Sequence, residues 1–173
     1  IDDLLESSRL ESKSVTLELI PLDVREIIKD ETRRVMSLYP DRVVNLDFTA
    51  NLPLVNGDPR RIAQVIENFF DNSIKHAPGS EINISVRSDE NNVVIDYYDT
   101  GPGIKPEFLN MIFNRFFRIP QQTRHTHGSG LGLSICKQIV ELHNGSIEAR
   151  SSPGRGLEFI TILPSIPDQG GRP

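Results

Sequence analysis

The sequence predicts an α+β fold: a two-layer α/β sandwich in which three main helices cover one face of a mixed, mostly antiparallel sheet of about five strands. Helix-like and strand-like segments are interspersed along the chain, and two pairs of neighbouring strands are separated by short turns typical of hairpins. The 173 residues fit one domain, and 37% hydrophobic with 25% charged residues is an ordinary balance that permits a real core.

The first half of the chain contains four elements before its longest helix. They are, in order, the end of an amphipathic helix at 1–12, a strand at 15–20, a helix at 24–38 and a strand at 43–48. Asp23 can cap the helix that follows it, because its carboxylate can accept from the free N–H groups of the first turn. The longest helix is predicted over 59–77. Asp58 is its N-cap, Pro59 suits its first position, and Pro78-Gly79 ends it.

The second half is predicted to form two hairpins and a third long helix. Its elements are strands at 81–88 and 92–99, a short helix starting at Pro106, an exposed loop at 119–127, a helix at 131–143, and strands at 145–151 and 157–163. Asn91-Asn92 and Ser152-Pro153-Gly154 are expected to form the hairpin turns, and Asn144-Gly145 to end the helix. The tail 164–173, rich in proline and glycine, is predicted to be disordered.

Composition narrows the classes of function. The net charge of -5 argues against nucleic acid as a partner, because duplex binding usually requires a basic surface. The single Cys136 excludes an internal disulfide and fits a reducing, cytoplasmic compartment. No apolar run approaches the ~20 residues of a membrane span, so no membrane contact is expected. Because the chain begins without Met in a helix-like pattern, we expect it to be a fragment of a longer protein, and the sequence leaves open whether that protein is membrane-anchored.

Four polar side chains share one face of the helix at 59–77. Asn68, Asn72, Lys75 and His76 follow the spacing i, i+4, i+7 and i+8. Amide oxygens can ligate Mg²⁺, and a lysine supplies a mobile positive charge for phosphate. Taken alone, such a stripe is more often the solvated outer face of an amphipathic helix.

Two glycine-rich segments follow. In residues 99–104 (DTGPGI), Asp99 ends a strand and could accept a hydrogen bond from an exocyclic amine such as that of adenine. Residues 128–133 (GSGLGL) lead into a helix, where backbone N–H groups can bind an anion, although the pattern is neither a dinucleotide fingerprint nor a P-loop. Each could equally be an ordinary turn or helix lead-in. Together with the polar stripe, in this order, they predict a site for a nucleoside triphosphate with its magnesium.

The ordered set resembles the catalytic, ATP-binding domain of sensor histidine kinases, within the superfamily shared with DNA gyrase, Hsp90 and MutL. Five segments carry the resemblance: 67–76 (ENFFDNSIKH) is similar to the N box, 99–104 and 128–133 to two glycine boxes, 112–118 (IFNRFFR) to the F box, and 154–159 (GRGLEF) to the last glycine box. The resemblance implies a Bergerat-type ATP-binding domain over 15–163. Residues 1–14 resemble the end of the dimerisation helix, and 164–173 would be a flexible tail.

The resemblance implies roles for individual residues. Asn72 would hold Mg²⁺ with help from Asn68, and Lys75 would contact phosphate. His76 would lie near the phosphates or the ribose, and Asp99 would read adenine. The remaining residues implied in ATP binding or catalysis are Glu67, with a catalytic or orienting role, and Gly101, Gly103, Ile104, Phe113, Arg118, Gly128, Ser129, Gly130, Leu131, Gly132 and Leu133. Asn68 and Lys75 would also serve catalysis, and the loop at 119–127 would be the ATP lid.

One position favours a kinase over an ATP hydrolase. Related ATPases such as gyrase carry a glutamate four residues before the magnesium asparagine, where it activates water. Here that position is Asn68, an amide without useful basicity, and Glu67 points about 100° away around the helix. A neutral imidazole is already nucleophilic, so transfer to a histidine depends mainly on positioning and charge neutralisation.

Departures from the family pattern define what the chain would lack. Leu157 stands where threonine is commoner, and none of His76, His125, His127 and His143 has the context of a phosphoacceptor. The chain would therefore phosphorylate a histidine on its own, absent dimerisation domain and serve a response regulator in a two-component phosphorelay. The full-length protein would be a homodimer and this fragment a monomer. The alternatives are a nucleotide-dependent interaction module without catalysis, an ATP hydrolase, and a Ser-directed kinase similar to anti-sigma factors.

Overall fold

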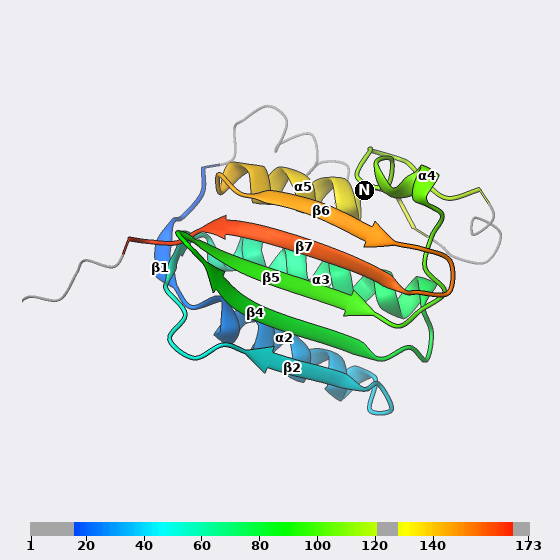
Figure 1. Cartoon of the computed structure of the whole chain (residues 1–173), viewed down its shortest axis with the longest axis horizontal. Helices are drawn as coiled ribbons and strands as arrows, with labels where there is room; N and C mark the ends of the chain where they lie inside the picture. Colours follow the sequence, from blue (N-terminus) through cyan, green and yellow to red (C-terminus); the bar gives the residue numbers. More distant parts are fainter. Residues whose placement is uncertain (1–15, 121–127, 168–173) are drawn as a thin grey trace, which may run out of the picture.

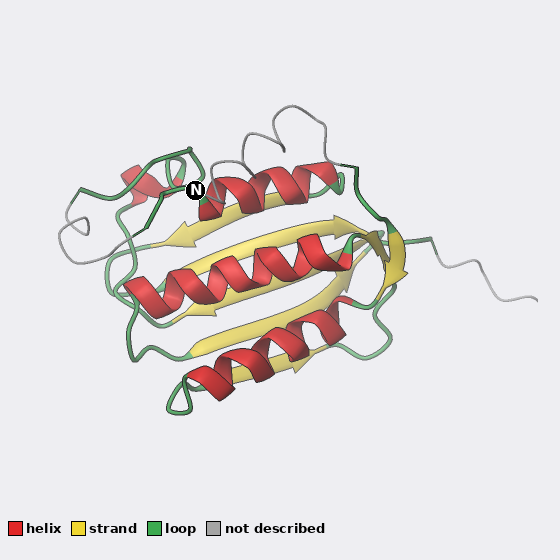
Figure 2. Cartoon of the chain, turned by 180° about the vertical axis from the view of Figure 1, so that it is seen from behind, coloured by secondary structure: helices red, strands yellow, loops and turns green. Residues whose placement is uncertain are grey.

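A five-stranded sheet with three helices packed on one face forms the centre of the structure (Figures 1 and 2). This computed structural model describes residues 16–120 and 128–167. The helix end predicted at 1–12, most of the lid predicted at 119–127 and the last residues of the tail lie outside the described residues. Within the described ranges, no helix is long and apolar enough to span a bilayer.

The sheet has the strand order β2-β4-β5-β7-β6. Its strands are β2 (Val44–Phe48), β4 (Ile82–Asp89), β5 (Asn92–Asp99), β6 (Ser146–Ser151) and β7 (Leu157–Pro164). β2 runs parallel to β4, and every other neighbouring pair is antiparallel. This arrangement confirms the predicted mixed, mostly antiparallel sheet. Figure 2 shows the helices in front of the sheet, which confirms the two-layer sandwich.

The helices begin and end close to the predicted positions. They are α2 (Val24–Leu38), α3 (Pro59–His76), the short α4 (Pro106–Leu109) and α5 (Gly132–Leu142). The Asp23 carboxylate accepts the N–H of Arg25 at 2.9 Å, and the Asp58 carboxylate accepts the N–H of Arg60 at 3.0 Å. Asn144 has a φ of 58°, the left-handed geometry expected just beyond α5.

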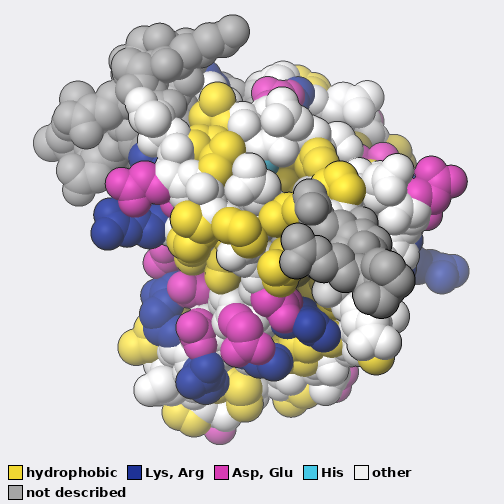
Figure 3. Space-filling model, turned by 90° about the vertical axis from the view of Figure 1, so that its left-hand side faces the viewer, with side chains coloured by type: hydrophobic (Ala, Val, Ile, Leu, Met, Phe, Trp, Pro, Cys, Tyr) yellow, Lys and Arg dark blue, Asp and Glu magenta, His cyan; other side chains and the backbone are white. Residues whose placement is uncertain are grey.

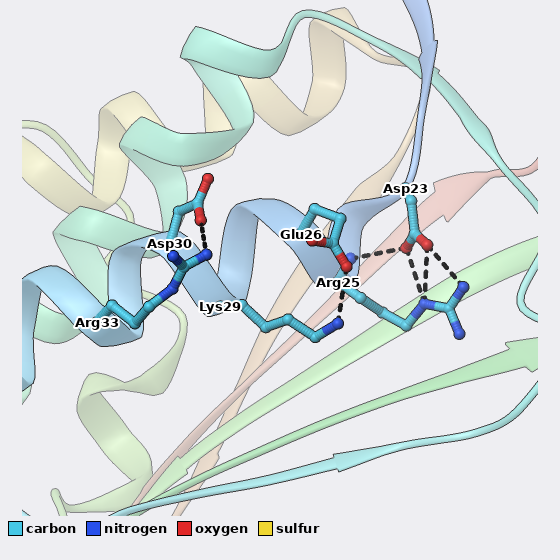
Figure 4. A network of polar contacts seen from close by, with 6 residues as sticks. All are labelled: Asp23, Arg25, Glu26, Lys29, Asp30 and Arg33. Atoms are coloured by element: carbon cyan, nitrogen blue, oxygen red, sulfur yellow. Dashed lines mark hydrogen bonds and ion pairs between the residues drawn. The ribbon is translucent and has the colours of Figure 1, made fainter.

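Ion pairs line the solvent-facing side of α2 (Figure 4). Arg25 pairs with Asp23 at 2.6 Å and Lys29 with Glu26 at 2.7 Å, and Arg33 pairs with Asp30 one turn further on. The hydrogen bond from Arg25 lowers the pKa of Asp23 below its ordinary value. Because the Lys29 and Arg33 pairs are well exposed, each stabilises the helix by less than about 1 kcal/mol. The position of α2 therefore depends on its buried face.

The first strand prediction was wrong. Within the described residues 16–20 only Ile20 is in a strand: β1 covers Ile20–Leu22 and pairs antiparallel with β3, Val55–Gly57. β3 was not predicted, because three residues are too few for a recognisable period-2 pattern. Figure 3 faces this end of the molecule, where hydrophobic side chains gather; Leu19, Ile20 and Leu54 are exposed here.

Two boundaries also differ from prediction. The first hairpin turns at Glu90-Asn91, one residue earlier than expected, and Glu90 takes the left-handed φ of 50°. β7 continues to Pro164 rather than 163. The N–H of Ser165 donates to the Asn91 carbonyl at 2.8 Å, and that of Ile166 donates to the Leu54 carbonyl at 2.7 Å. Residues 164–166 are thus hydrogen-bonded, although the sequence placed them in a disordered tail.

Aromatic side chains fix α3 on the middle of the sheet. Phe69 stacks on Phe159 with ring centroids 4.6 Å apart, and Phe70 meets Tyr97 edge to face at 5.4 Å. All four rings are at most 1% exposed. Because these aromatic contacts hold α3 in place, they also fix the position of its polar face relative to the segment that follows β5 and the segment that precedes α5.

Thr161 is a polar residue in this core whose replacement should stabilise the protein. It is 2% exposed, and its hydroxyl has no hydrogen-bond partner within the described structure. Thr161→Val keeps the shape and removes a desolvated hydroxyl, so we expect the free energy of unfolding to rise by about 1 kcal/mol. Urea unfolding measures it. Thr161→Ser, which keeps the hydroxyl, should be destabilised, and a valine variant less stable than wild type would contradict the expectation.

Candidate functional site

A cavity of about 330 Å³ lies between the second half of α3, the segment after β5 and the start of α5. Its lining residues are Asn68, Asp71, Asn72, Lys75, His76, Ala77, Asp99, Pro102, Gly103, Ile104, Ile112, Phe117, Arg118, Ile119, Gly128, Ser129, Gly130, Gly132, Leu133 and Leu157. The polar stripe and both glycine segments thus meet at one place, although Asn68 and Leu133 are 65 positions apart in sequence.

Four predicted site residues do not line the cavity. Glu67 is exposed and its carboxylate pairs with Arg34 of α2 at 3.0 Å. Phe113 and Leu131 were expected to contact ATP but are apolar residues of the core: Leu131 is fully buried, and the Phe113 ring meets Phe159. Gly101 instead supports the wall, because its N–H donates to the Asp99 carboxylate at 2.9 Å.

Asp99 is held by donors on its protein side. The carboxylate is 2% exposed; besides the Gly101 N–H, it accepts the Ser73 hydroxyl at 2.8 Å. The Tyr97 hydroxyl donates in turn to the Ser73 oxygen at 3.2 Å, and burial raises the pKa of Tyr97, which keeps this donor protonated. A carboxylate has about four acceptor positions, so Asp99 retains capacity for a donor within the cavity.

The polar stripe of α3 forms another wall. Asn68, Asn72, Lys75 and His76 all line the cavity, as their spacing predicted. The His76 Nδ1 atom is buried without a partner among the described residues. Burial, aided by the positive charges of Lys75 and Arg118, lowers the pKa of His76, so the ring is neutral at neutral pH and can donate or accept.

The donor set suits a magnesium ion that is shared with a polyphosphate. No group of three or more His, Cys, Asp or Glu residues that could hold a metal occurs in the described ranges. Mg²⁺ needs no such group, because it usually keeps several waters and takes one or two protein oxygens in addition to phosphate oxygens. The amides of Asn68 and Asn72, one turn apart on the same wall, fit this requirement.

Comparison with known protein families identifies the family of this chain, and the matched residues include the cavity. The sequence model of the family described as "Histidine kinase-, DNA gyrase B-, and HSP90-like ATPase" matches residues 57–167, more than half of the chain. The chain belongs to this ATPase family. The match contains every residue that lines the cavity.

Within the family, this ATPase domain is homologous to sensor histidine kinases. It is 31% identical over 169 residues to sensor histidine kinase MtrB of Mycobacterium tuberculosis, covering 96% of this chain and 30% of MtrB. It is 32% identical over 167 residues to sensor protein SrrB of Staphylococcus aureus, covering 95% of this chain and 29% of SrrB. The chain thus spans about 30% of the length of these curated relatives.

Solved histidine kinases share the fold of this ATPase domain. Full-length ShkA in complex with AMPPNP superposes with a TM-score of 0.82 at 26% identity, covering 95% of this chain and 35% of that one. The mycobacterial sensor histidine kinase MprB gives 0.74 at 29% identity, covering 86% and 99%. The resemblance seen in the motifs and the predicted fold class are both confirmed.

Most of the apolar residues that line the cavity were missed from sequence. Ala77, Pro102, Ile112, Phe117, Ile119 and Leu157 all contribute, as does the acidic Asp71. Leu157, which replaces the commoner threonine, is 7% exposed and presents carbon to the cavity. Asp71 could have been found, because it lies four residues before Lys75 and pairs with it at 3.1 Å. The three phenylalanines of the segment 112–118 differ in exposure: Phe113 and Phe117 are partly buried, and Phe116 is 59% exposed.

The start of α5 packs closely against Asn68. The Cys136 thiol, which is fully buried on the apolar face of α5 as predicted, donates to the Val65 carbonyl of α3 at 3.8 Å. One turn earlier, Gly132 leaves room for the Asn68 amide: a Cβ there would lie 3.1 Å from the Asn68 Oδ1. The carboxamide therefore lies against the start of α5 and also lines the cavity.

Cys136 should make the stability of this ATPase domain fall in alkali. Burial raises the pKa of its thiol from 9.0 to about 12, so the folded state favours the protonated form. This contribution is complete below pH 9 and is lost as the pH rises towards 12, at up to about 1.4 kcal/mol per pH unit. Urea unfolding of wild type and Cys136→Val at pH 8, 9, 10 and 11, under reducing conditions, should show the steeper decline in wild type. Parallel profiles would contradict the burial argument.

Proposed function

We propose that this domain binds Mg-ATP in the cavity and transfers the γ-phosphoryl group to a histidine on a dimerisation domain, as the catalytic part of a two-component sensor. The observation that carries the proposal is the convergence of the α3 stripe, Asp99 and the glycine segments on one cavity. Homology to sensor histidine kinases supports it, as does the AMPPNP bound by the structural neighbour ShkA.

The base end of the site is apolar apart from Asp99. Ile104, Ile112 and Leu157 line the cavity together with Gly103 and can cover the faces of a flat ring. Asp99, fixed by Ser73 and Gly101, accepts the exocyclic amine of adenine. Such a site rejects bases that lack an exocyclic amine, because the buried Asp99 carboxylate would then have no donor in the cavity.

The phosphate end is polar and cationic. Lys75 contacts phosphate, and the neutral His76 ring bonds the ribose or a phosphate oxygen. Gly128, Ser129, Gly130 and Gly132 line the same space, where backbone N–H groups before α5 can bind an anion. Asn72, with Asn68 beside it, holds the magnesium, which neutralises the charge of the phosphates. The chain thus orients the terminal phosphate and supplies no nucleophile of its own.

The amide at position 68, four residues before Asn72, favours transfer over hydrolysis. Asn68 cannot take a proton from water, and Glu67 is directed to Arg34 on the outside of α3. An acceptor imidazole needs no such base. In that position Glu67 could orient an approaching acceptor helix only from outside the cavity. The proposed partners are the protein's own dimerisation domain, a response regulator and a second copy of the full-length protein.

The test is phosphoryl transfer to a separate acceptor. The protein is mixed with ATP, Mg²⁺ and a folded dimerisation domain of a related sensor kinase, and acid-labile phosphate on the acceptor is measured. Transfer supports the proposal. Release of inorganic phosphate without transfer indicates a hydrolase, and tight nucleotide binding without either indicates an interaction module.

Asn72→Ala should separate metal binding from nucleotide binding. We expect it to lower the affinity for Mg-ATP by about tenfold or more, and to change the affinity for ATP in EDTA little, because the lost amide binds through the metal. Calorimetry measures both. Asn45→Ala, on the edge strand β2, is the control and should alter neither. An unchanged Mg-ATP affinity for Asn72→Ala would remove the metal role.

A further inference from the structure

Arg42 is a buried cation outside every motif considered so far. It lies in the connection between α2 and β2, is 8% exposed, and precedes residue 57, where the family match begins. Its guanidinium donates three hydrogen bonds to backbone carbonyls: Nη1 to Ala77 at 3.0 Å and to Ser80 at 2.9 Å, and Nη2 to Ser73 at 2.9 Å. All three of these hydrogen bonds go to the backbone of residues 73–80.

These carbonyls mark the C-terminal end of α3. The Ser73 oxygen also accepts the N–H of Ala77, the residue that caps the helix, and the Ala77 oxygen lies beyond the last helical residue. Carbonyls at a helix C-terminus carry partial negative charge and lack intrahelical donors. The planar guanidinium therefore adds donors to carbonyls that already accept the N–H groups of Ala77 and Ser80, and its positive charge is balanced at this end of α3.

The same turn of α3 supports the base-reading carboxylate. The Ser73 hydroxyl donates to Asp99, and Ala77 lines the cavity. Ala77 also packs closely against Gly101, because a Cβ on that glycine would lie 2.4 Å from the Ala77 Cβ. Arg42 thus bonds to Ser73, which donates to Asp99, and to Ala77, which packs against Gly101, the other donor to Asp99.

We propose that Arg42 is a positioning residue for base recognition: by holding Ser73 and Ala77 it aims the Asp99 carboxylate at the exocyclic amine of adenine. The inference rests on the proposed function, since it requires Asp99 to read that amine. Arg42 touches no nucleotide itself, so its removal should affect the amine contact and spare the phosphate contacts made by Lys75 and the start of α5.

The test pairs a change in the protein with a change in the ligand. Mg-ADP and the Mg-diphosphate of purine riboside, which lacks the exocyclic amine, are titrated by calorimetry into wild type and Arg42→Met. We expect wild type to prefer ADP by about tenfold or more, and Arg42→Met to bind ADP about tenfold more weakly with purine riboside diphosphate unchanged within about twofold. Arg42→Lys keeps the charge without the fork and should give an intermediate preference. Arg87→Met, an exposed arginine of β4, should behave as wild type.

The outcomes separate the two proposals. If wild type binds neither ligand, nucleotide binding itself is wrong. If wild type prefers ADP and both Arg42 variants keep that preference, or lose affinity for both ligands equally, Arg42 is only a stabilising residue and the positioning role is wrong. Circular dichroism establishes that each variant is folded at the titration temperature. Should Arg42→Met be unfolded there, the ratio measured for Arg42→Lys decides by the same criterion.

Discussion

Replacing Asp99 with alanine is expected to lower the affinity for ADP by roughly 100-fold. Two effects combine. The acceptor for the exocyclic amine is lost, and the Ser73 hydroxyl and Gly101 N–H, which both donate to this carboxylate, lose their buried partner. The segment 101–104 then has less to hold it against α3, so the change removes a contact and loosens the wall that carries it.

Calorimetry on folded protein measures this effect, and Asp96→Ala is the matched control. Asp96 lies on the same strand three residues earlier, on the opposite face of the sheet, where it pairs with Arg87 at 3.4 Å. Its removal should leave ADP affinity within about twofold, because an exposed pair contributes little. An Asp99→Ala protein that binds ADP like wild type would show that the base is recognised elsewhere.

Gly156→Ala is expected to have the largest effect on stability, a loss of about 2–4 kcal/mol. Gly156 has a φ of 73°, and an added Cβ would lie 1.9 Å from the Asp99 carbonyl oxygen and 2.8 Å from the Tyr98 ring. The carbonyl cannot yield without moving the end of β5. ADP affinity should therefore fall together with stability, because the displaced residue, Asp99, is the one proposed to bind the base.

Gly154→Ala separates the clash from the backbone geometry. Gly154 lies in the same turn with a φ of 74°, and no atom lies within 4 Å of its added Cβ. Its substitution should cost only the strain of a left-handed alanine, about 1 kcal/mol, with ADP affinity retained. Urea unfolding and calorimetry on both variants make the comparison. An equal loss of unfolding free energy in the two variants would show that the close approach of Gly156 to the Asp99 carbonyl does not add to the cost of the substitution.

The elements that could be predicted are those whose signals are local. Asp23 and Asp58 mark the starts of α2 and α3, because capping needs only a carboxylate two or three residues before the first free N–H groups. The polar stripe of the site could be predicted as well, because the spacing of side chains that share one face of a helix is also a local signal. Asp99 and the glycine segments were located by their order along the chain and by family resemblance.

What the sequence could not reveal depends on contacts between distant residues. Ile112 and Leu157 are 45 positions apart and form one apolar wall, for which no periodicity exists to be read. β1 and β3 stabilise each other across more than 30 residues. Arg42 reads as a surface arginine in a turn, and only the folded chain shows that it bonds to a helix end.

The close packing of Gly132 of α5 against the Asn68 amide of α3 has a consequence for dynamics. Because both residues of this contact also line the cavity, the free energy of filling the cavity and that of opening the α3–α5 contact are linked, and each must change the other by the same amount. Backbone amides of α5 should therefore exchange their hydrogens more slowly when Mg-ATP is bound, including those near Ile139 that no ligand reaches. Binding of Mg-ATP in the cavity would then be detectable by hydrogen exchange in a part of α5 that does not line the cavity.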